Sequence, residues 1–306
     1  MRPSGEQIEL RYEDQSAVVV EVGAALREYR RGDRDVVDPF AVDRMADGGR
    51  GAVLVPWPNR LADGSYEFDG QRHQTPLTEP EKHNAIHGLL RWRPWDVGAR
   101  DAARVEMRAR IHPQPGFPFM LDLSVNYELS ESGLTVTTTA TNIGADPSPF
   151  GCGQHPYLSP GRGLVDDCEL SFQAATRIEV DDERELPTGT APVSGSEYDF
   201  SAGRLIGGAV LDDAFTDLGR DDSGRTWVRL RRPDGATAEF WADANYRYLQ
   251  FFTGETLARD RVRRGIACEP MTCAPNAFNS GDGLVRLEPG EQHQARWGLA
   301  LVANRG

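Results

Sequence analysis

Lysine is almost absent from this chain of 306 residues. Of its 34 lysine and arginine residues, 33 are arginine, and Lys82 is the single lysine. Schiff-base enzymes use a lysine as their nucleophile, and P-loop proteins grip phosphate with one. Lys82 follows the polar stretch Glu79-Pro80-Glu81, and no glycine-rich loop precedes it. The sequence therefore excludes both classes.

Cysteine and long apolar runs are also scarce. The cysteines are Cys152, Cys168, Cys268 and Cys273. Four are too few for a disulfide framework at this length. The longest apolar stretch, residues 17–26, is broken by Glu21 and is far too short to span a membrane. The first residues lack the apolar run of a signal peptide, so we expect a cytoplasmic protein.

Positive charge is in deficit as well. The 34 basic residues are outnumbered by 47 acidic ones, which leaves a net charge of −13. An acidic surface repels phosphate backbones and anionic lipid, so we expect no nucleic-acid partner and no membrane association. The length is ample for a large core. We predict one domain over residues 1–306, as a monomer or a weak homodimer.

Apolar and polar residues alternate through much of the chain, as in strands with one buried face. Residues 119–129 show this pattern, and residues 105–111 and 134–140 repeat it on either side. The turn Glu131-Ser132-Gly133 joins residues 119–129 to residues 134–140, so the three segments together predict an antiparallel meander. Asp69-Gly70 and Asp234-Gly235 mark two further hairpins.

Other strand candidates are residues 8–12, 17–29, 170–172, 248–252 and 293–302. No helical stripe longer than about two turns is present. We therefore predict an all-β protein, a large antiparallel β-sandwich. Because β architectures serve many functions, the site has to be found from individual residues.

Two of the six histidines lie in segments that do not look like plain strands. His87 precedes a glycine in Asn84-Ala85-Ile86-His87-Gly88, and His155 follows Gly153-Gln154. Glycine beside a polar residue permits the close approach of a ligand, and Pro156 restricts His155 to an extended conformation. The alternative is a pair of turn histidines bonded to nearby backbone.

Glu269 is the one carboxylate in the apolar run Ile266-Ala267-Cys268-Glu269-Pro270-Met271. It either points to solvent from an edge strand or lies in a pocket of low dielectric constant. In a pocket its pKa rises, which makes it a competent general base near neutral pH.

Two more segments offer groups that bind hydroxyls. In Val55-Pro56-Trp57-Pro58-Asn59-Arg60, two prolines stiffen the chain, and Asn59 and Arg60 are multidentate donors. Leu211-Asp212-Asp213-Ala214-Phe215 sets two carboxylates between apolar residues. The alternatives are a structural proline-rich turn and an ordinary turn opened by Asp-Asp.

A metal site is an alternative to an acid–base site. Zinc favours cysteine and histidine, and Cys152, His155, Cys268 and Cys273 could converge in space. Their spacing matches no standard pair of zinc knuckles, and buried free cysteine is common. A nucleophilic pair of Cys152 and His155 is disfavoured because no third orienting group is evident. We therefore predict no metal.

The ordered set of these segments resembles the aldose 1-epimerase (galactose mutarotase-like) family. The matching stretches are residues 56–61, 84–88, 153–157, 211–215 and 269–279. Each is weak alone, but five in the correct order are specific, and they extend over most of the chain. The family fold is a large antiparallel β-sandwich, in agreement with the period-two patterns.

The resemblance implies roles for individual residues. Glu269 corresponds to the general base and His155 to the general acid. Arg60, His87 and Asp212 correspond to groups that hold sugar hydroxyls, and Asn59 supports the loop. One departure is that the acidic Asp213 follows Asp212, which leaves open which of the two contacts the sugar. The reaction, interconversion of the α and β anomers of an aldose, needs no cofactor.

Three kinds of sugar-binding protein are compatible with these residues. We expect a free neutral aldose, with Trp57 available to pack on its apolar face and Trp241 in the core. A charged sugar would need an arginine-rich subsite, which Arg91 and Arg93 could form if their segment is extended; the simpler expectation is that both are solvated. A non-catalytic sugar-binding module is the third reading, and it would not need both Glu269 and His155.

Overall fold

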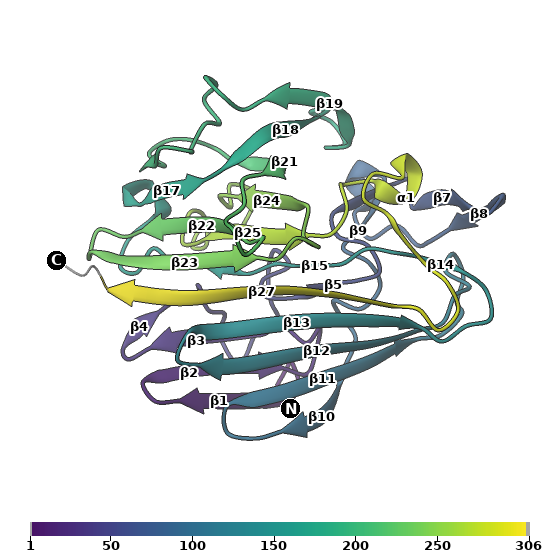
Figure 1. The fold of residues 1–306 in the computed structure, drawn as a ribbon, viewed down its shortest axis with the longest axis horizontal. Coiled ribbons are helices and arrows are strands. Elements are labelled where there is room, and N and C mark those ends of the chain that lie inside the picture. The colour runs from purple at the N-terminus through teal and green to yellow at the C-terminus, as the bar shows by residue number, and fades with distance from the viewer. Residues whose placement is uncertain (1, 304–306) are drawn as a thin grey trace.

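The computed structural model describes residues 2–303, and it confirms the predicted all-β class. Two large antiparallel sheets pack face to face, and a smaller sheet extends the sandwich (Figure 1). Among the described residues, no helix is long and apolar enough to cross a membrane.

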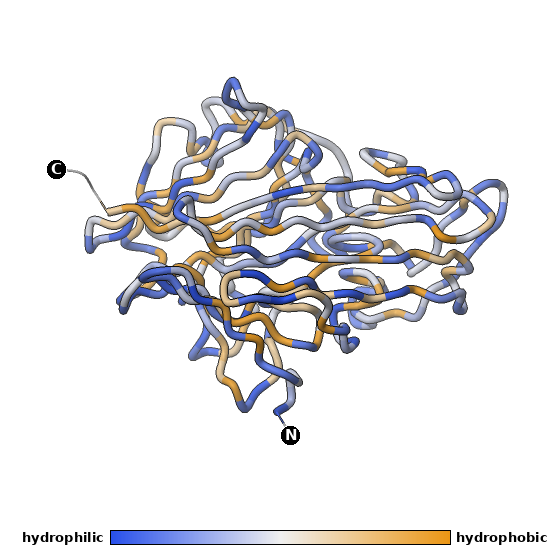
Figure 2. The backbone as a smooth tube through the Cα atoms, turned by 60° about the horizontal axis from the view of Figure 1, so that its bottom comes forward, coloured by the Kyte–Doolittle hydropathy of each residue, from blue (hydrophilic) through white to orange (hydrophobic). Residues whose placement is uncertain are grey.

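The first large sheet has nine strands. In spatial order they are β10 (Asp96–Arg100), β11 (Arg104–Ile111), β12 (Leu121–Ser130), β13 (Gly133–Asn142), β27 (Gln292–Ala303), β23 (Ala236–Ala242), β22 (Thr226–Arg231), β17 (Glu169–Phe172) and β20 (Arg204–Leu205). The predicted meander is confirmed as β11, β12 and β13, and Tyr127 pairs with Val136 in its register. Hydropathy alternates along these strands because only one face is buried (Figure 2).

The second large sheet has eight strands and carries the candidate site. In spatial order they are β19 (Pro187–Pro192), β18 (Ala174–Val180), β21 (Asp212–Leu218), β24 (Tyr248–Phe252), β25 (Ile266–Met271), β15 (Gly153–Gln154) and β5 (Val53–Leu54), with β16 (Tyr157–Leu158) also paired to β25. Every residue of β25 is buried. Its near-continuous apolar run therefore marks an interior strand of the sheet.

A four-stranded sheet of β1 (Gln7–Tyr12), β2 (Gln15–Val20), β3 (Leu26–Arg31) and β4 (Arg34–Asp35) lies beside the meander. The prediction of one strand over residues 17–29 is wrong, because the chain reverses between β2 and β3. Gly23 and Ala24 have φ of 73° and 46°, a left-handed conformation that no strand continues through. The turn residues Val22-Gly23-Ala24-Ala25 carry no polar side chain, so the hydropathy pattern does not distinguish this turn from a continuing strand.

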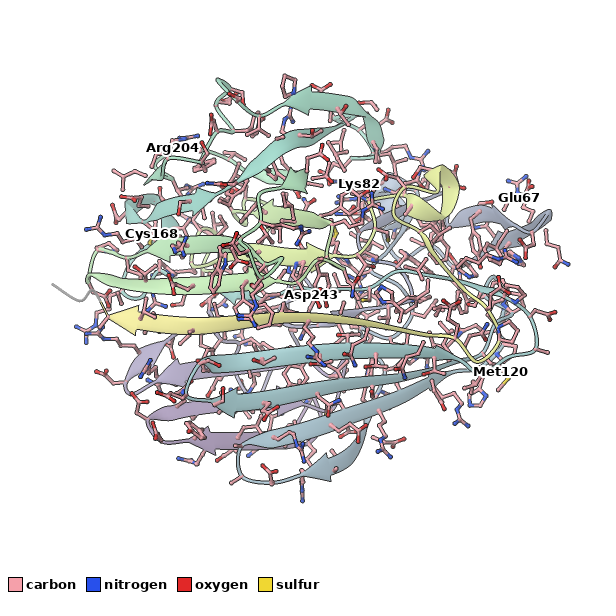
Figure 3. All side chains as sticks on the ribbon, viewed as in Figure 1. Glu67, Lys82, Met120, Cys168, Arg204 and Asp243 are labelled. Atoms are coloured by element: carbon pink, nitrogen blue, oxygen red, sulfur yellow. The ribbon has the colours of Figure 1, made fainter. Side chains whose placement is uncertain are left out.

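The remaining elements are short. They are the pairs β6 (Arg60–Ala62) with β9 (Asn84–Ile86), β7 (Ser65–Phe68) with β8 (Gln71–Gln74), and β14 (Ser148–Phe150) with β26 (Val285–Leu287), the helix α1 (Ala277–Ser280), and 3₁₀ turns at Pro80–Lys82 and Val165–Asp167. The two Asp-Gly turns predicted from the sequence connect β7 to β8 and β22 to β23. Lys82 lies near β9 and α1, inward of the β7–β8 hairpin that carries Glu67 (Figure 1 and Figure 3).

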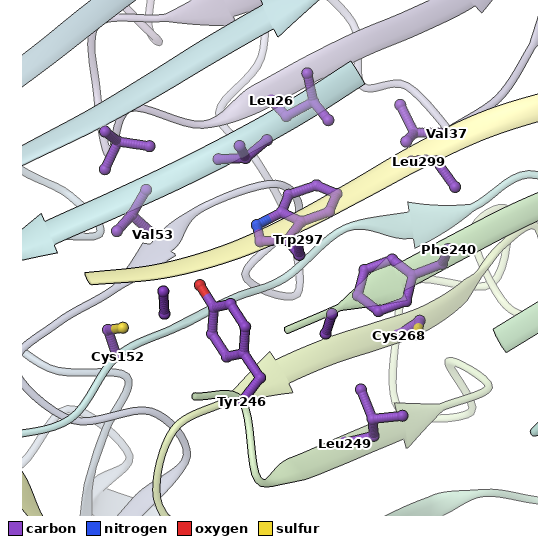
Figure 4. Close-up of a cluster of buried hydrophobic side chains, with 14 of the residues drawn as sticks. Leu26, Val37, Val53, Cys152, Phe240, Tyr246, Leu249, Cys268, Trp297 and Leu299 are labelled. Atoms are coloured by element: carbon purple, nitrogen blue, oxygen red, sulfur yellow. The ribbon is translucent and has the colours of Figure 1, made fainter. Parts of the chain in front are cut away.

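The core between the sheets is built on large apolar side chains. Trp297 is fully buried and stacks on Phe240, with ring centroids 5.5 Å apart (Figure 4). Its Nε1 donates to Oε1 of Gln154 at 3.0 Å, which ties β27 to β15 across the two sheets. Burying a side chain of this size contributes roughly 1.5–3 kcal/mol. The core thus fixes β15, and with it the start of the segment that carries His155.

Candidate active site

Glu269 lies in the interior of the second sheet, on β25. It is 2% exposed and pairs in register with Gln250 of β24. The edge-strand alternative is therefore wrong. Burial raises the pKa of Glu269 well above its usual range, and the nearby Asp212 carboxylate raises it further, while Arg60 opposes this.

His155 lies between β15 and β16 and faces Glu269. Its Nε2 is 3.3 Å from Oε1 of Glu269. The imidazole stacks on Tyr157, with centroids 5.0 Å apart and planes at 8°. A Cβ at Gly49 would lie 2.6 Å from Cδ2 of His155, so this ring needs a glycine behind it. Burial lowers the pKa of His155 to about 3, and the charge of Arg50 adds to the shift.

His87 completes the cluster. Its ring centroid is 5.4 Å from that of His155. The backbone N–H of Asn59 donates to Nδ1 of His87 at 3.2 Å, so in the neutral ring the proton belongs on Nε2. His87 and Asn59 both have left-handed backbones, with φ of 63° and 54°. This strain in two neighbouring segments is typical of a functional site. Burial lowers the pKa of His87 well below its usual value.

Asp212 and Asp213 point to opposite faces of β21. Oδ1 of Asp212 accepts a hydrogen bond from Nε2 of Gln250 at 2.7 Å, on the side of Glu269. Asp213 is instead paired with Arg177 at 2.8 Å. The alternation of a strand therefore places Asp212, and not Asp213, with the cluster. Burial raises the pKa of Asp212 to about 6.

This shift predicts a pH-dependent effect on stability. The pKa of Asp212 is about 6 in the folded state, above the ordinary value of 3.8, so its charge opposes folding above pH 6. Asp212→Asn is expected to raise the free energy of unfolding by roughly 1–3 kcal/mol at pH 8 and to leave it unchanged below pH about 3.8. Denaturant unfolding at the two pH values measures this. An equal effect at both would contradict the buried charge.

Arg60 is held by carboxylates. Its Nε and Nη2 donate to Glu79 at 2.9 Å each, and Nη2 also contacts Glu185. Glu185 in turn pairs with Lys82, so the only lysine is part of this network. We expected Arg60 to bind hydroxyls directly. The structure shows a braced guanidinium whose Nη1 lies outside these contacts and whose charge reaches Asp212, Glu269 and His87.

The residues proposed for zinc are not brought together. Cys152 and Cys268 lie apart among apolar side chains, with Tyr246 in the same cluster (Figure 4). Among residues 2–303, the group close enough to share a metal ion is His87, His155 and Glu269, whose candidate ligand atoms lie within 4.8 Å of one another. No cysteine belongs to it. The physical reason is that the cysteines fill the core, as small apolar side chains do.

Both tryptophan expectations are wrong. Trp57 is 3% exposed and meets Phe278 edge-on at 5.4 Å, so its face is not free for a sugar. Trp241 is half-buried on the more polar face of β23, outside the core, and the guanidinium of Arg225 lies 3.9 Å over its ring. The stiff proline segment therefore serves to place Asn59 and Arg60.

Sequence reasoning missed several side chains of this site. Gln250 links Asp212 to Asn59. The Nε2 of Gln250 donates to Oδ1 of Asp212, and the Oε1 of Gln250 lies 3.5 Å from Nδ2 of Asn59. A glutamine inside the apolar strand Tyr248–Phe252 was a signal that could have been used. Arg50 is 2% exposed, lies 3.9 Å over the Tyr157 ring and pairs with Asp38 at 2.6 Å. Nothing local in the sequence marked it.

The family model for aldose 1-epimerase matches residues 6–300, nearly the whole chain. The chain belongs to the aldose 1-epimerase family. This confirms the resemblance seen in the sequence.

Individual relatives of this family support the assignment. The Escherichia coli K12 protein YihR, itself uncharacterized, is 36% identical over 297 residues, 96% of this chain and 92% of YihR. The aldose 1-epimerase of Escherichia coli K12 is 25% identical over 285 residues, 83% of this chain and 80% of that enzyme. Among solved structures, the GalM/aldose epimerase homologue from C. elegans has a TM-score of 0.86 at 20% identity and covers 97% of this chain and 99% of its own. That likeness shows the shared fold.

Proposed function

We propose that the protein is an aldose mutarotase that interconverts α and β anomers by general acid–base catalysis. The observation that carries the proposal is the contact between Glu269 and His155, two buried titratable groups 3.3 Å apart. A base and an acid this close can serve two oxygens bonded to the same carbon. In a cyclic aldose these are O1 and the ring oxygen O5.

The reaction balances without an external reagent. Glu269 takes the O1 proton as His155 gives a proton to O5, the C1–O5 bond breaks, and a C1 carbonyl forms. Rotation about C1–C2 turns the other face of the carbonyl toward the O5 hydroxyl. O5 then adds to C1, returns its proton to His155, and O1 recovers the proton from Glu269. Each acid–base group contributes about 10²–10⁴-fold.

The two pKa shifts fit this cycle. The raised pKa of Glu269 favours its protonated carboxylic acid, and the lowered pKa of His155 favours its neutral imidazole. In the free site the two residues are therefore both uncharged, and the titratable proton that they share lies on Glu269. Ring opening moves the O1 proton to Glu269 and removes the proton from His155, and so produces that same uncharged pair. Before ring opening, the proton on Glu269 must therefore move to His155, and burial disfavours the charged pair that results; ring opening then restores the uncharged pair.

The remaining groups of the site bind and orient the sugar. His87 presents an Nε2–H because Asn59 occupies its Nδ1. Asp212 is held by Gln250 and can accept from hydroxyls, and the braced Arg60 supplies positive charge near the developing carbonyl oxygen. A binding module would gain nothing from a buried acid–base pair, whose desolvation opposes folding. This favours an enzyme over the non-catalytic alternative.

Polarimetry tests the proposal directly. Freshly dissolved single anomers of several aldoses, neutral and anionic, should relax to equilibrium rotation faster with the protein than without it. The rate should rise linearly with protein concentration. If none of the sugars relaxes faster, the mutarotase proposal is wrong.

Metal removal gives a further prediction. Because the cycle uses two side chains and no Lewis acid, exhaustive chelation should leave the rate unchanged. Added Zn²⁺ should inhibit, since His87, His155 and Glu269 are the same groups that would bind it. Loss of activity on chelation, restored by stoichiometric Zn²⁺, would contradict the acid–base cycle.

A further inference from the structure

Arg91 lies beside the active site, four residues after His87. The expectation that it is a solvated surface arginine is wrong, because the side chain is half-buried. The segment is not extended either: the N–H of Arg93 bonds to the carbonyl of Leu90 at 3.1 Å in a turn. Arg93 is exposed, as expected, but the two arginines are not fixed on one side of a strand.

The Arg91 guanidinium has no counterion within ion-pairing distance among the described residues. The carboxylate whose charge reaches it, Glu79, is already bound through both oxygens by Arg60. Two other half-buried arginines are paired, Arg177 with Asp213 and Arg263 with Asp166 and Glu255, whereas Arg204, Arg225 and the buried Arg232 have no carboxylate within ion-pairing distance among the described residues. An unpaired, partly desolvated guanidinium is costly, and where it lines a cavity, as Arg91 does, an anion from outside the chain can offset that cost.

Arg91 lines a cavity of about 360 Å³ together with Arg93, Trp57, Trp92, Gly88 and Gln114. Within the described residues, none of those lining it is acidic. The indole N–H of Trp57 is buried and has no hydrogen-bond partner there. Arg91 lies 3.9 Å over the ring of Trp92, so the ring covers the flat face of the guanidinium and leaves its edges to donate. The cavity therefore presents two positive charges and no carboxylate, with Thr78 and Gln114 as its neutral polar side chains.

This cavity adjoins the catalytic cluster. Gly88, in its wall, follows His87 directly, and a Cβ at Gly88 would lie 2.0 Å from the carbonyl oxygen of Val55. The positive charge of Arg91 also lowers the pKa of both His87 and His155. The cavity and the cluster are therefore linked through the segment His87-Gly88 and through the charge of Arg91.

We propose that the cavity binds an anionic substituent, a sulfonate, phosphate or carboxylate, of the sugar whose O1 and O5 face Glu269 and His155. This inference rests on the proposed mutarotase function and narrows its substrate class to acidic sugars. Arg91 receives the anion through two parallel N–H donors, and the Trp57 indole N–H adds a third. Discrimination against the neutral sugar follows, because without the anion Arg91 stays buried and unpaired.

The test compares one hexose with its derivatives that carry phosphate, sulfonate or carboxylate at the carbon farthest from C1. Rates of anomer exchange give kcat/KM for each. Wild-type protein is expected to prefer one anionic sugar by about a hundredfold or more. Arg91→Met should reduce this preference by about 30- to 1,000-fold, mainly through KM, and Arg91→Lys should keep part of it. Arg225→Met, which also removes a guanidinium from over a tryptophan, is the matched control and should leave the preference unchanged.

The outcomes separate the two proposals. Fast exchange of the neutral sugar with no preference for any anionic form would overturn the anion cavity and leave the mutarotase intact. No exchange with any sugar would overturn the mutarotase. In that case calorimetric titration with the anionic sugars still decides the cavity: binding that Arg91→Met abolishes supports it, and binding that is absent or unaffected overturns it.

Discussion

Glu269→Gln is expected to lower kcat for anomer exchange by about 10²–10⁴-fold, with a much smaller change in KM. The amide keeps the shape of the side chain and cannot accept the O1 proton. The sugar still binds through the other groups of the site, so the loss falls on the chemical step. Exchange kinetics at saturating sugar measure it, with Glu239→Gln, on the more polar face of β23, as the control that should be unaffected. Retention of more than about a tenth of the wild-type rate would rule out Glu269 as the base.

The same variant should be more stable than the wild type at neutral pH. The pKa of Glu269 is higher in the folded than in the unfolded chain, because burial disfavours its charge. Ionisation of Glu269 therefore opposes folding as pH rises through the folded pKa, whereas well below pH 4 the group is protonated in both states. A gain in unfolding free energy at pH 8 that vanishes at low pH would separate lost catalysis from lost structure.

His155→Gln should cost a similar factor, about 10²–10⁴ in kcat, because His155 is the group that gives O5 its proton in the proposed cycle. The two residues act as a unit across their 3.3 Å contact, so the double variant should lose far less than the product of the single losses. Burial lowers the pKa of His155 to about 3, so the pair takes up a second proton only in strong acid. Activity should fall as pH approaches that value.

Circular dichroism of each variant is the control for folding. Independent, multiplying effects of the two substitutions would contradict a coupled acid–base pair. So would an undiminished rate in His155→Gln, which would transfer the role of acid to His87, whose Nε2–H faces the same cluster.

Period-two alternation was enough to predict the fold class and most of the nine-stranded sheet, because those strands bury one face. It failed at residues 17–29, where the hairpin turn at Gly23 and Ala24 is itself apolar. It also gave no sign of β18 and β19. The segment Pro187–Pro192 is polar and half-exposed, and only its pairing with β18 makes it a strand.

The residues of the candidate site could be predicted from the sequence because glycine or proline lies beside several of them. The contacts that surround these residues could not be predicted. Residues far apart in the sequence decide them: Gln250 holds Asp212, and Glu79 and Glu185 brace Arg60. The unpaired state of Arg91 is likewise a property of the folded site, since it depends on Glu79 being bound elsewhere.

The central claim is that Glu269 and His155 together open and close a sugar ring. Two-dimensional NMR exchange on an equilibrated sugar in D₂O tests it most directly, with neutral and anionic hexoses in the panel. We predict exchange peaks between the α and β anomeric protons that depend on wild-type protein, no deuterium incorporation at C2, and no exchange above background in the Glu269→Gln, His155→Gln double variant. Protein-dependent exchange that persists in the double variant, or deuterium at C2, would contradict ring opening by this pair.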